Sequence, residues 1–294
     1  AQDLNEPGEW GAGPVPCNVA DGRRVNVAMA YLDPCRERGN LTVRGGVRVR
    51  RVVIEGGRAI GVEVDAGRTS RVLRAGEVVL SAGAVATAQL LMLSGIGPAE
   101  ELLLHDIDVV VDAPGVGRLF DHPALDLHFH APDLPPAPPG PAFQAALHLG
   151  SGVTGADHDD VELLAMVRPY GVADGSDPSD TARSLRVGIQ RTARPGRVRL
   201  ESAAPHAPPV VDLGYLAADE DVARARHAVR AAVELLQSAP FSRAAGRPTL
   251  RGGPSPAELA EDRLLDQWVL ANLGTSMHSM GTAAMGADED PFAV

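Results

Sequence analysis

The chain has 294 residues, of which 45% are hydrophobic and 22% charged, and it carries a formal net charge of −11. These values fit a folded chain of one large or two ordinary domains, and the acidity argues against partners such as nucleic acid or anionic membrane. All 27 basic residues are arginine, so chemistry that needs a lysine, such as a Schiff base or a P-loop, is excluded.

Neither a membrane span nor a cysteine framework is expected. No apolar run approaches the ~18 residues that a transmembrane helix needs. Cys17 and Cys35 have no metal-ligand spacing and are expected to be free thiols. The chain begins with Ala1 rather than Met, so the compartment stays open, and a cytoplasmic location is the working expectation.

The first third of the chain predicts a β-meander. After a Gly- and Pro-rich start and a short apolar helix near residues 28–32, Val-rich segments alternate with Gly and Arg. We expect strands at residues 41–44, 47–56, 59–67, 70–75 and 77–83.

Residues 81–98, SAGAVATAQLLMLSGIGP, change from strand to helix periodicity. Thr87 is predicted to cap a helix that Gly95 closes in a left-handed conformation. Pro98 is predicted to hold the first position of a second short helix, and residues 107–112 to form another strand.

The second half predicts an antiparallel sheet and helices. Its expected strands are residues 161–170, 184–192 and 196–202, after a proline-dense boundary loop at 131–141. A helix over residues 219–239 is indicated by apolar residues at helical spacing. Another begins with a capping box, Ser255 to Glu258, and is expected to end at Gly274.

The strand-to-helix turn at Gly83 and Ala84 has the chemistry of an anion site. Small residues let the backbone approach a ligand, and a helix N-terminus offers unpaired N–H groups to a phosphate. Taken alone, such a turn is more often a plain connection that binds nothing.

The whole string from residue 83 to 98 closely resembles the second signature of the glucose–methanol–choline (GMC) oxidoreductases, flavoenzymes that oxidise alcohols. Ala88 departs from the pattern, since proline or serine is usual there. The matching residues are Gly83, Ala84, Thr87, Leu90, Leu91, Ser94, Gly95, Ile96 and Gly97.

Other segments resemble the family in the same order along the chain. The run at 113–123 is one residue shorter than its counterpart and lacks that counterpart's asparagine, while MHSMGTAAMG at 277–286 resembles a His-Pro-Val-Gly-Thr segment. Asp212 and Tyr215 also fit. The remaining similar segments are residues 21–43 and 47–64.

The resemblance implies FAD as cofactor and an alcohol as substrate. His278 is implied as the catalytic residue that takes the hydroxyl proton while hydride goes to flavin N5, a role for which imidazole is suited near neutral pH. The implied cofactor contacts are Val49, whose backbone faces the adenine, and Ser81, Ala82, Gly83, Ala84, Asp121 and His122.

Two alternatives stay open. The chain is a non-catalytic relic or binding module without FAD, or it is a metal-dependent enzyme that uses His122, His128 and His130. His128 and His130 are two apart, so on a strand they point to one face, but no spacing nominates a further ligand, and no metal site is assigned.

The family's G-x-G-x-x-G loop is expected near the N-terminus, and GEWGAGPVP at 8–16 does not supply it, because it follows no strand and opens no helix. The chain ends at GADEDPFAV, before the family's second catalytic His or Asn. We therefore expect a fragment of a GMC oxidoreductase that does not hold FAD by itself.

The expected fold is α/β. Residues 1–130 would form a partial FAD-binding, Rossmann-like domain with the β-meander, and residues 131–273 a substrate domain, an antiparallel sheet backed by helices. Residues 274–294 would return to the FAD domain and carry His278. The sequence names neither the alcohol, nor the electron acceptor (oxygen, a quinone or another carrier), nor the oligomeric state.

Overall fold

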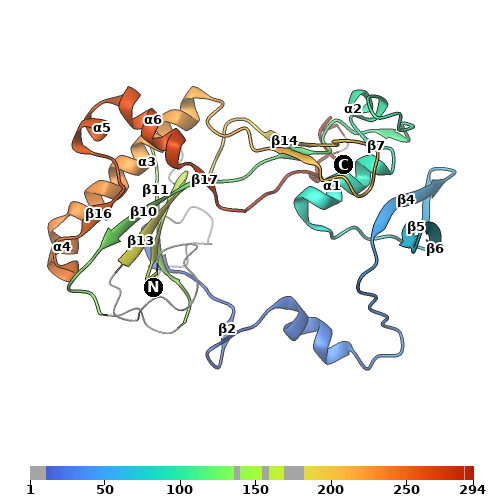
Figure 1. Cartoon of the computed structure of the whole chain (residues 1–294), viewed down its shortest axis with the longest axis horizontal. Coiled ribbons are helices and arrows are strands. Elements are labelled where there is room, and N and C mark those ends of the chain that lie inside the picture. Colours follow the sequence, from blue (N-terminus) through green and yellow to red (C-terminus); the bar gives the residue numbers. More distant parts are fainter. Residues whose placement is uncertain (1–10, 136–139, 154–158, 169–181, 288) are drawn as a thin grey trace. The chain divides into compact units, whose positions relative to one another are not determined.

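The computed structural model describes residues 11–135, 140–153, 159–168, 182–287 and 289–294. It has the α/β fold that the sequence predicts, divided into two compact units (Figure 1). The sheet unit comprises Ala1–Arg38, His122–Ala193 and Leu216–Met277. The meander unit comprises Gly39–Asp121, Arg194–Tyr215 and His278–Val294.

These units differ in extent from the predicted domains, because residues up to Arg38 cluster with the sheet unit and Arg194–Tyr215 with the meander unit. That one unit binds flavin and the other substrate stays a prediction. Among the described residues, no helix combines the length and the apolar character that a membrane crossing requires.

The sheet unit is built on a seven-stranded antiparallel sheet. Six strands follow one another in a continuous path, and β17 (Gly274–Thr275) pairs with β10. The path runs β1 (Gly11–Pro14), β11 (Phe143–Leu149), β12 (Val161–Met166), β13 (Ala182–Ile189), β10 (Pro123–His130) and β16 (Thr249–Arg251).

One face of this sheet carries the core, because apolar residues alternate along its strands. Leu125, Leu127, Val187 and Leu163 belong to one buried cluster with the apolar face of helix α3 (Asp219–Gln237). Figure 1 shows the helices of this unit beside the sheet. The others are α4 (Ala239–Ala245), α5 (Pro256–Ala260) and α6 (Asp262–Asn272).

The helix termini follow the sequence signals closely. Helix α3 begins with three acidic residues and ends at Gln237, near the predicted position, and Pro240 then lies in the first turn of α4. The capping box of Ser255 and Glu258 is confirmed. The helix expected to run to Gly274 is two helices, because Glu261 is extended and separates α5 from α6.

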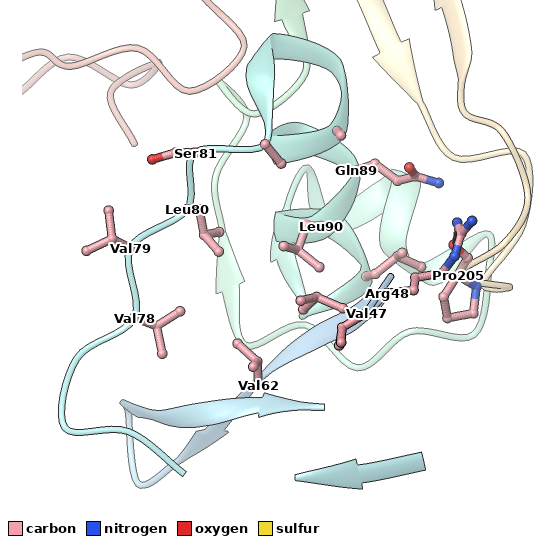
Figure 2. A pocket seen from close by; sticks show the side chains of 14 residues that line it. Val47, Arg48, Val62, Val78, Val79, Leu80, Ser81, Gln89, Leu90 and Pro205 are labelled. Carbon is pink, nitrogen blue, oxygen red and sulfur yellow. Dashed lines mark hydrogen bonds between the residues drawn. The ribbon is translucent and has the colours of Figure 1, made fainter. Parts of the chain in front are cut away.

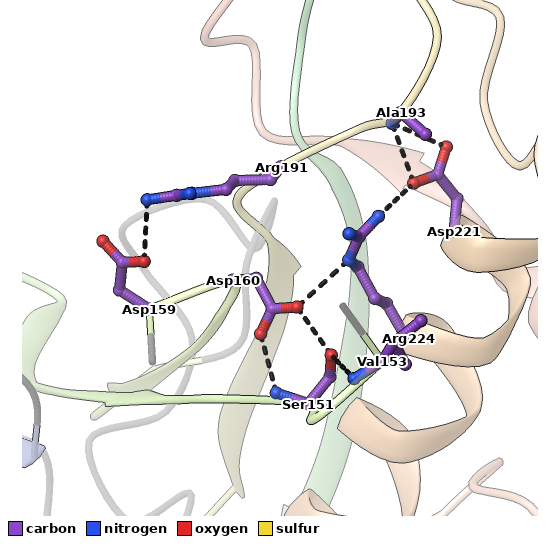
Figure 3. Close-up of polar contacts among 8 residues, drawn as sticks. All are labelled: Ser151, Val153, Asp159, Asp160, Arg191, Ala193, Asp221 and Arg224. Atoms are coloured by element: carbon purple, nitrogen blue, oxygen red, sulfur yellow. Dashed lines mark hydrogen bonds and ion pairs between the residues drawn. The ribbon is translucent and has the colours of Figure 1, made fainter. Parts of the chain in front are cut away.

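A buried ionic cluster joins α3 to the sheet (Figure 3). The Arg224 guanidinium donates to Asp160 through Nε at 3.0 Å and to Asp221 through Nη1 at 2.9 Å, and both carboxylates are fully buried. Ser151 donates to Asp160 from its amide and its hydroxyl. Each buried charge of this cluster is thus hydrogen-bonded, the condition for burying a charge at tolerable cost.

The chain before Arg38 forms small elements: β2 (Val19–Ala20), β3 (Arg23–Arg24), a π-helical turn at Ala28–Leu32 where the short helix was expected, and a 3-10 turn at Asp33–Cys35. Cys17 and Cys35 are free thiols, as predicted.

The meander unit contains the predicted antiparallel meander, β4 (Val49–Glu55), β5 (Arg58–Ala66) and β6 (Thr69–Arg74). Helix α1 (Gly83–Leu93) packs on it, and a small core forms around Ala88, Met92, Leu102 and Val116. The remaining elements are β7 (Ile96–Gly97), α2 (Ala99–Leu103), β8 (Val111–Asp112), β9 (Arg118–Leu119), β14 (Gly196–Arg199) and β15 (Val210–Asp212).

Three predicted strands of this unit were wrong in whole or in part. Residues 41–44 and 77–83 form no strand, and the expected strand at 107–112 is reduced to β8. A strand needs a hydrogen-bonding neighbour, and among the described residues none pairs with residues 77–82. Val79 is consequently 77% exposed.

The helix caps of this unit are partly as predicted. Gly95 follows α1 with a φ of +82°, the left-handed closure that was expected. Thr87 is not the cap, because the helix begins at Gly83, and Thr87 Oγ1 instead accepts the Ala82 amide at 3.1 Å. Pro98 precedes α2 as its N-cap rather than occupying its first position.

Candidate cofactor-binding and catalytic site

A groove of about 580 Å³ lies between the meander and α1 (Figure 2). Three of the predicted cofactor contacts line it: Val49 from β4, and Ser81 and Ala82 from the segment before α1. These positions are far apart in the sequence and meet because β4 packs against α1. The other lining residues are Val47, Arg48, Val62, Val78, Val79, Leu80, Ala86, Gln89, Leu90, Leu93 and Pro205.

The groove is apolar along most of its length and polar at one end. Figure 2 shows Gln89, Arg48 and Pro205 together, away from Val78 and Val79. Gln89 donates to the Ala207 carbonyl at 2.8 Å and so ties the loop around Pro205 to α1. An apolar slot with polar groups at one end suits a flat heteroaromatic ring such as the adenine of FAD.

The turn into α1 has open space before it. Gly83 has a φ of +83°, and a Cβ built on it would meet no atom within 4 Å. The N–H groups in the first turn of an α-helix lack intrahelical partners and favour an anionic ligand. Gly83 and Ala84 therefore have the backbone chemistry that was predicted for a cofactor contact.

The segment that carries His278 is held beside this turn within the meander unit. Phe120 and Met280 exchange backbone hydrogen bonds of 2.9 and 2.8 Å, and the Gly117 amide donates to the Thr282 carbonyl at 2.9 Å. Thr282 Oγ1 donates to the Ala84 carbonyl at 2.7 Å. The side chain of Thr282 thus links the first turn of α1 to the His278 segment, a link that the sequence did not predict.

Asp121 brings two further predicted positions together. Its Oδ1 accepts the His278 amide and its Oδ2 accepts the Tyr215 hydroxyl, both at 2.7 Å. Asp121 is only 3% exposed, whereas His278 is exposed. The sequence nominated all three residues separately, and the structure places them in one hydrogen-bonded group.

His122, the last predicted cofactor contact, belongs to the sheet unit. Its carbonyl accepts the Ser276 amide at 3.0 Å, which joins the start of β10 to the chain after β17.

Two histidines of the metal alternative, His128 and His130, lie on one strand as the sequence predicts. His128 and His130 point to one face of β10, and His128 Nδ1 lies 2.7 Å from Ser184 Oγ. Within the described ranges, no three His, Cys, Asp or Glu side chains are grouped as metal ligands. Asp126 on the same face contacts Arg186 at 3.3 Å, and burial raises the pKa of this carboxyl.

Gly11 and Gly13, in the region considered for the dinucleotide loop, lie in β1. That strand pairs antiparallel with β11 at the edge of the large sheet. Its geometry is that of an edge strand, not of a turn that opens a helix. The described residues therefore fit the adenine end of FAD, in the groove, better than they fit the pyrophosphate.

Comparison with known proteins gives a consistent assignment. Two family models described as GMC oxidoreductase match residues 1–124 and 192–294. An uncharacterized GMC-type oxidoreductase in the thcA 5′ region of Rhodococcus erythropolis is 37% identical over 99% of this chain and 55% of its own length. An oxygen-dependent choline dehydrogenase of Brucella canis is 33% identical over the whole of this chain and 57% of its own.

The fold comparison agrees. The crystal structure of pyridoxine 4-oxidase from Mesorbium loti superimposes with a TM-score of 0.82 and 30% sequence identity, covering 97% of this chain and 56% of that one. The chain thus spans a little over half the length of the relatives that it matches.

Proposed function

The chain belongs to the GMC oxidoreductase family, and on that premise we propose that it serves in FAD-dependent oxidation of an alcohol. The groove between β4 and α1 takes the adenine end of the cofactor. His278 is the group that accepts the hydroxyl proton of the substrate.

The observation that carries this proposal is the assembly of Val49, Ser81 and Ala82 in one groove. Each was predicted from the sequence as a cofactor contact. No local sequence pattern predicts that Val49 lies near Ser81 and Ala82. The apolar walls exclude water from an adenine ring, and the adjoining turn at Gly83 presents backbone N–H groups to a phosphate.

The chain's own residues have two tasks in this reaction. Phe120 and Met280 exchange backbone hydrogen bonds, and Thr282 and Asp121 fix the backbone on either side of that pair. Together these bonds set the position of His278. The exposed imidazole then takes the alcohol proton as general base. Bound FAD supplies the hydride acceptor.

Two relatives support an alcohol as substrate, since they are named for choline and pyridoxine, which both carry hydroxyl groups. Those names do not choose a substrate for this chain. Choline and pyridoxine are therefore the first probes, with oxygen and an artificial dye as alternative electron acceptors.

Nucleotide binding tests the groove directly. We expect calorimetry to detect AMP binding to the purified chain and to an Ala257→Trp control, in which an exposed helical alanine of the sheet unit is enlarged. Ala86→Trp enlarges an exposed alanine that lines the groove and should abolish AMP binding. Absence of AMP binding to the native chain, or equal binding to Ala86→Trp, would contradict the proposal.

Retention of FAD, followed by an assay of alcohol oxidation, distinguishes an enzyme from a binding module. After incubation with FAD and desalting, a retained flavin band near ~450 nm means that the chain holds the whole cofactor. Alcohol oxidation that His278→Ala abolishes then supports catalysis. A chain that retains flavin but oxidises none of the alcohols would contradict the enzymatic role. A chain that binds AMP and retains no flavin would be either the fragment that the sequence predicts or a binding module.

A further inference from the structure

We propose that Asp121 is a positioning residue, whose buried carboxylate fixes the backbone of His278 and acts on the reaction only through it. This inference rests on the proposed function of His278 as proton acceptor. It assigns Asp121 a task different from the direct cofactor contact that the sequence suggested.

The first observation is the pair of hydrogen bonds that the carboxylate accepts. The His278 amide reaches Oδ1 and the Tyr215 hydroxyl reaches Oδ2, each at 2.7 Å. These are charge-assisted bonds, which are shorter and stronger than bonds between neutral groups. Because both oxygens are engaged, the carboxylate can neither rotate nor shift without losing a bond.

The second observation is the burial of Asp121 at 3% exposure. A buried carboxylate without donors would cost several kcal/mol, so the fold strongly favours the conformation in which the His278 amide points at it. The donor is the backbone of His278. Asp121 therefore fixes the main chain and leaves the imidazole available for chemistry.

The third observation is the place of this bond in the segment. Gly117 pairs with Thr282, Phe120 with Met280 and His122 with Ser276, so the Asp121 bond lies between two backbone bonds and holds the stretch that carries His278. Met277, directly before it, has a φ of +59°. This left-handed conformation costs roughly 1 kcal/mol or more for a non-glycine residue and persists only where the surroundings hold it.

Tyr215 acts on the same carboxylate from the other side. Its hydroxyl holds Oδ2 and so keeps Oδ1 directed at the His278 amide. Removing only this hydroxyl leaves the Asp121 charge and the His278 bond in place. Tyr215→Phe should therefore loosen the segment less than Asp121→Ala does.

Hydrogen–deuterium exchange of the full chain, read on peptides that cover residues 276–284, measures this positioning. We expect Asp121→Ala to speed exchange there by about tenfold, the effect of losing one hydrogen bond to a charged group. Peptides from β13 should keep their native rate. Asp121→Asn should restore most of the protection, because its carboxamide oxygen can accept the His278 amide and its NH₂ can donate to Tyr215.

His278→Ala is the matched control. It removes the proposed proton acceptor but keeps the backbone N–H, so exchange over 276–284 should stay native. Asp33→Ala, a loss of charge on the surface of the sheet unit, should change neither exchange nor alcohol oxidation. If His278→Ala retains full alcohol oxidation while Asp121→Ala speeds exchange, the proposed function fails and the positioning stands.

The positioning is overturned if exchange over 276–284 stays native in both Asp121→Ala and Tyr215→Phe. It is also overturned if Asp121→Asn exchanges as fast as Asp121→Ala, since hydrogen-bond geometry would then not be what holds the segment. Should Asp121→Ala unfold the whole chain, Tyr215→Phe and Asp121→Asn decide the matter, because both keep a side-chain oxygen that can accept the His278 amide.

Discussion

The hydroxyl of Ser94 accepts the backbone amide of Val52 at 2.8 Å and donates to the Leu90 carbonyl at 2.6 Å. One side chain thus joins the middle of β4 to the end of α1. These two elements form the walls of the groove proposed to hold adenine. The serine that the signature contains therefore serves the site by fixing the distance between its walls.

Ser94→Ala should lower the free energy of unfolding by about 1–3 kcal/mol, because the buried Val52 amide loses its acceptor. Denaturant titration measures the change. Ser70→Ala, which removes a hydroxyl that bonds Glu63 on the exposed surface of the same meander, is the control and should change stability less than Ser94→Ala does. Equal losses in the two variants would contradict a special role for Ser94.

Gly95→Ala should destabilise the fold by more than about 2 kcal/mol. Its φ of +82° disfavours a side chain by about 1–2 kcal/mol, and a Cβ would lie 2.5 Å from the Asp108 carbonyl oxygen. Gly76→Ala is the matched control, since Gly76 has no positive φ and its added Cβ would meet nothing within 4 Å. The thermal midpoints of both variants, compared with the native chain, test this.

Arg224→Met should lower the free energy of unfolding by about 3–5 kcal/mol, because Asp160 and Asp221 would stay buried without their cation (Figure 3). Arg191→Met breaks an ion pair with Asp159 that is about half exposed and should cost at most about 1 kcal/mol. Urea unfolding of both variants gives the comparison. A loss below 1 kcal/mol for Arg224→Met would show that the cluster relaxes or takes up water.

Asp126→Asn should alter how stability depends on pH. Burial raises the pKa of the Asp126 carboxyl above its ordinary value of 3.8, although Arg186 and His128 act in the opposite direction. The folded state then holds the proton more tightly than the unfolded state. The stabilisation from this group is fully present below the unfolded pKa and is lost as pH rises through the folded pKa.

The asparagine does not titrate, so the variant should gain stability relative to the native chain as pH rises above 3.8. Denaturant titrations at several pH values between about 3 and 7 follow this difference. A difference that stays constant, or that shrinks with rising pH, would contradict the prediction. Asp262→Asn is the control and should show the opposite trend, because a hydrogen bond from Arg230 lowers the pKa of that carboxyl.

Local signals predicted much of the fold because they act over a few residues. The meander strands, the left-handed glycine after α1 and the capping box before α5 all depend on backbone preferences that neighbours in the chain decide. Thr87 was misassigned because two residue types suited to a helix start, Gly83 and Thr87, stand in one turn, and the sequence does not rank them.

In the candidate site, too, some features were predictable from the sequence and others were not. The sequence by itself determined the family resemblance and the chemical types at Val49, Ser81, Asp121 and His278, because these lie in recognisable strings of residues. Only the tertiary structure decided that Asp121 bonds the backbone of His278, and that the apolar run at 77–82 has no strand beside it among the described residues. Both depend on which distant segments become neighbours, and a hydrogen bond needs a partner that no local pattern names.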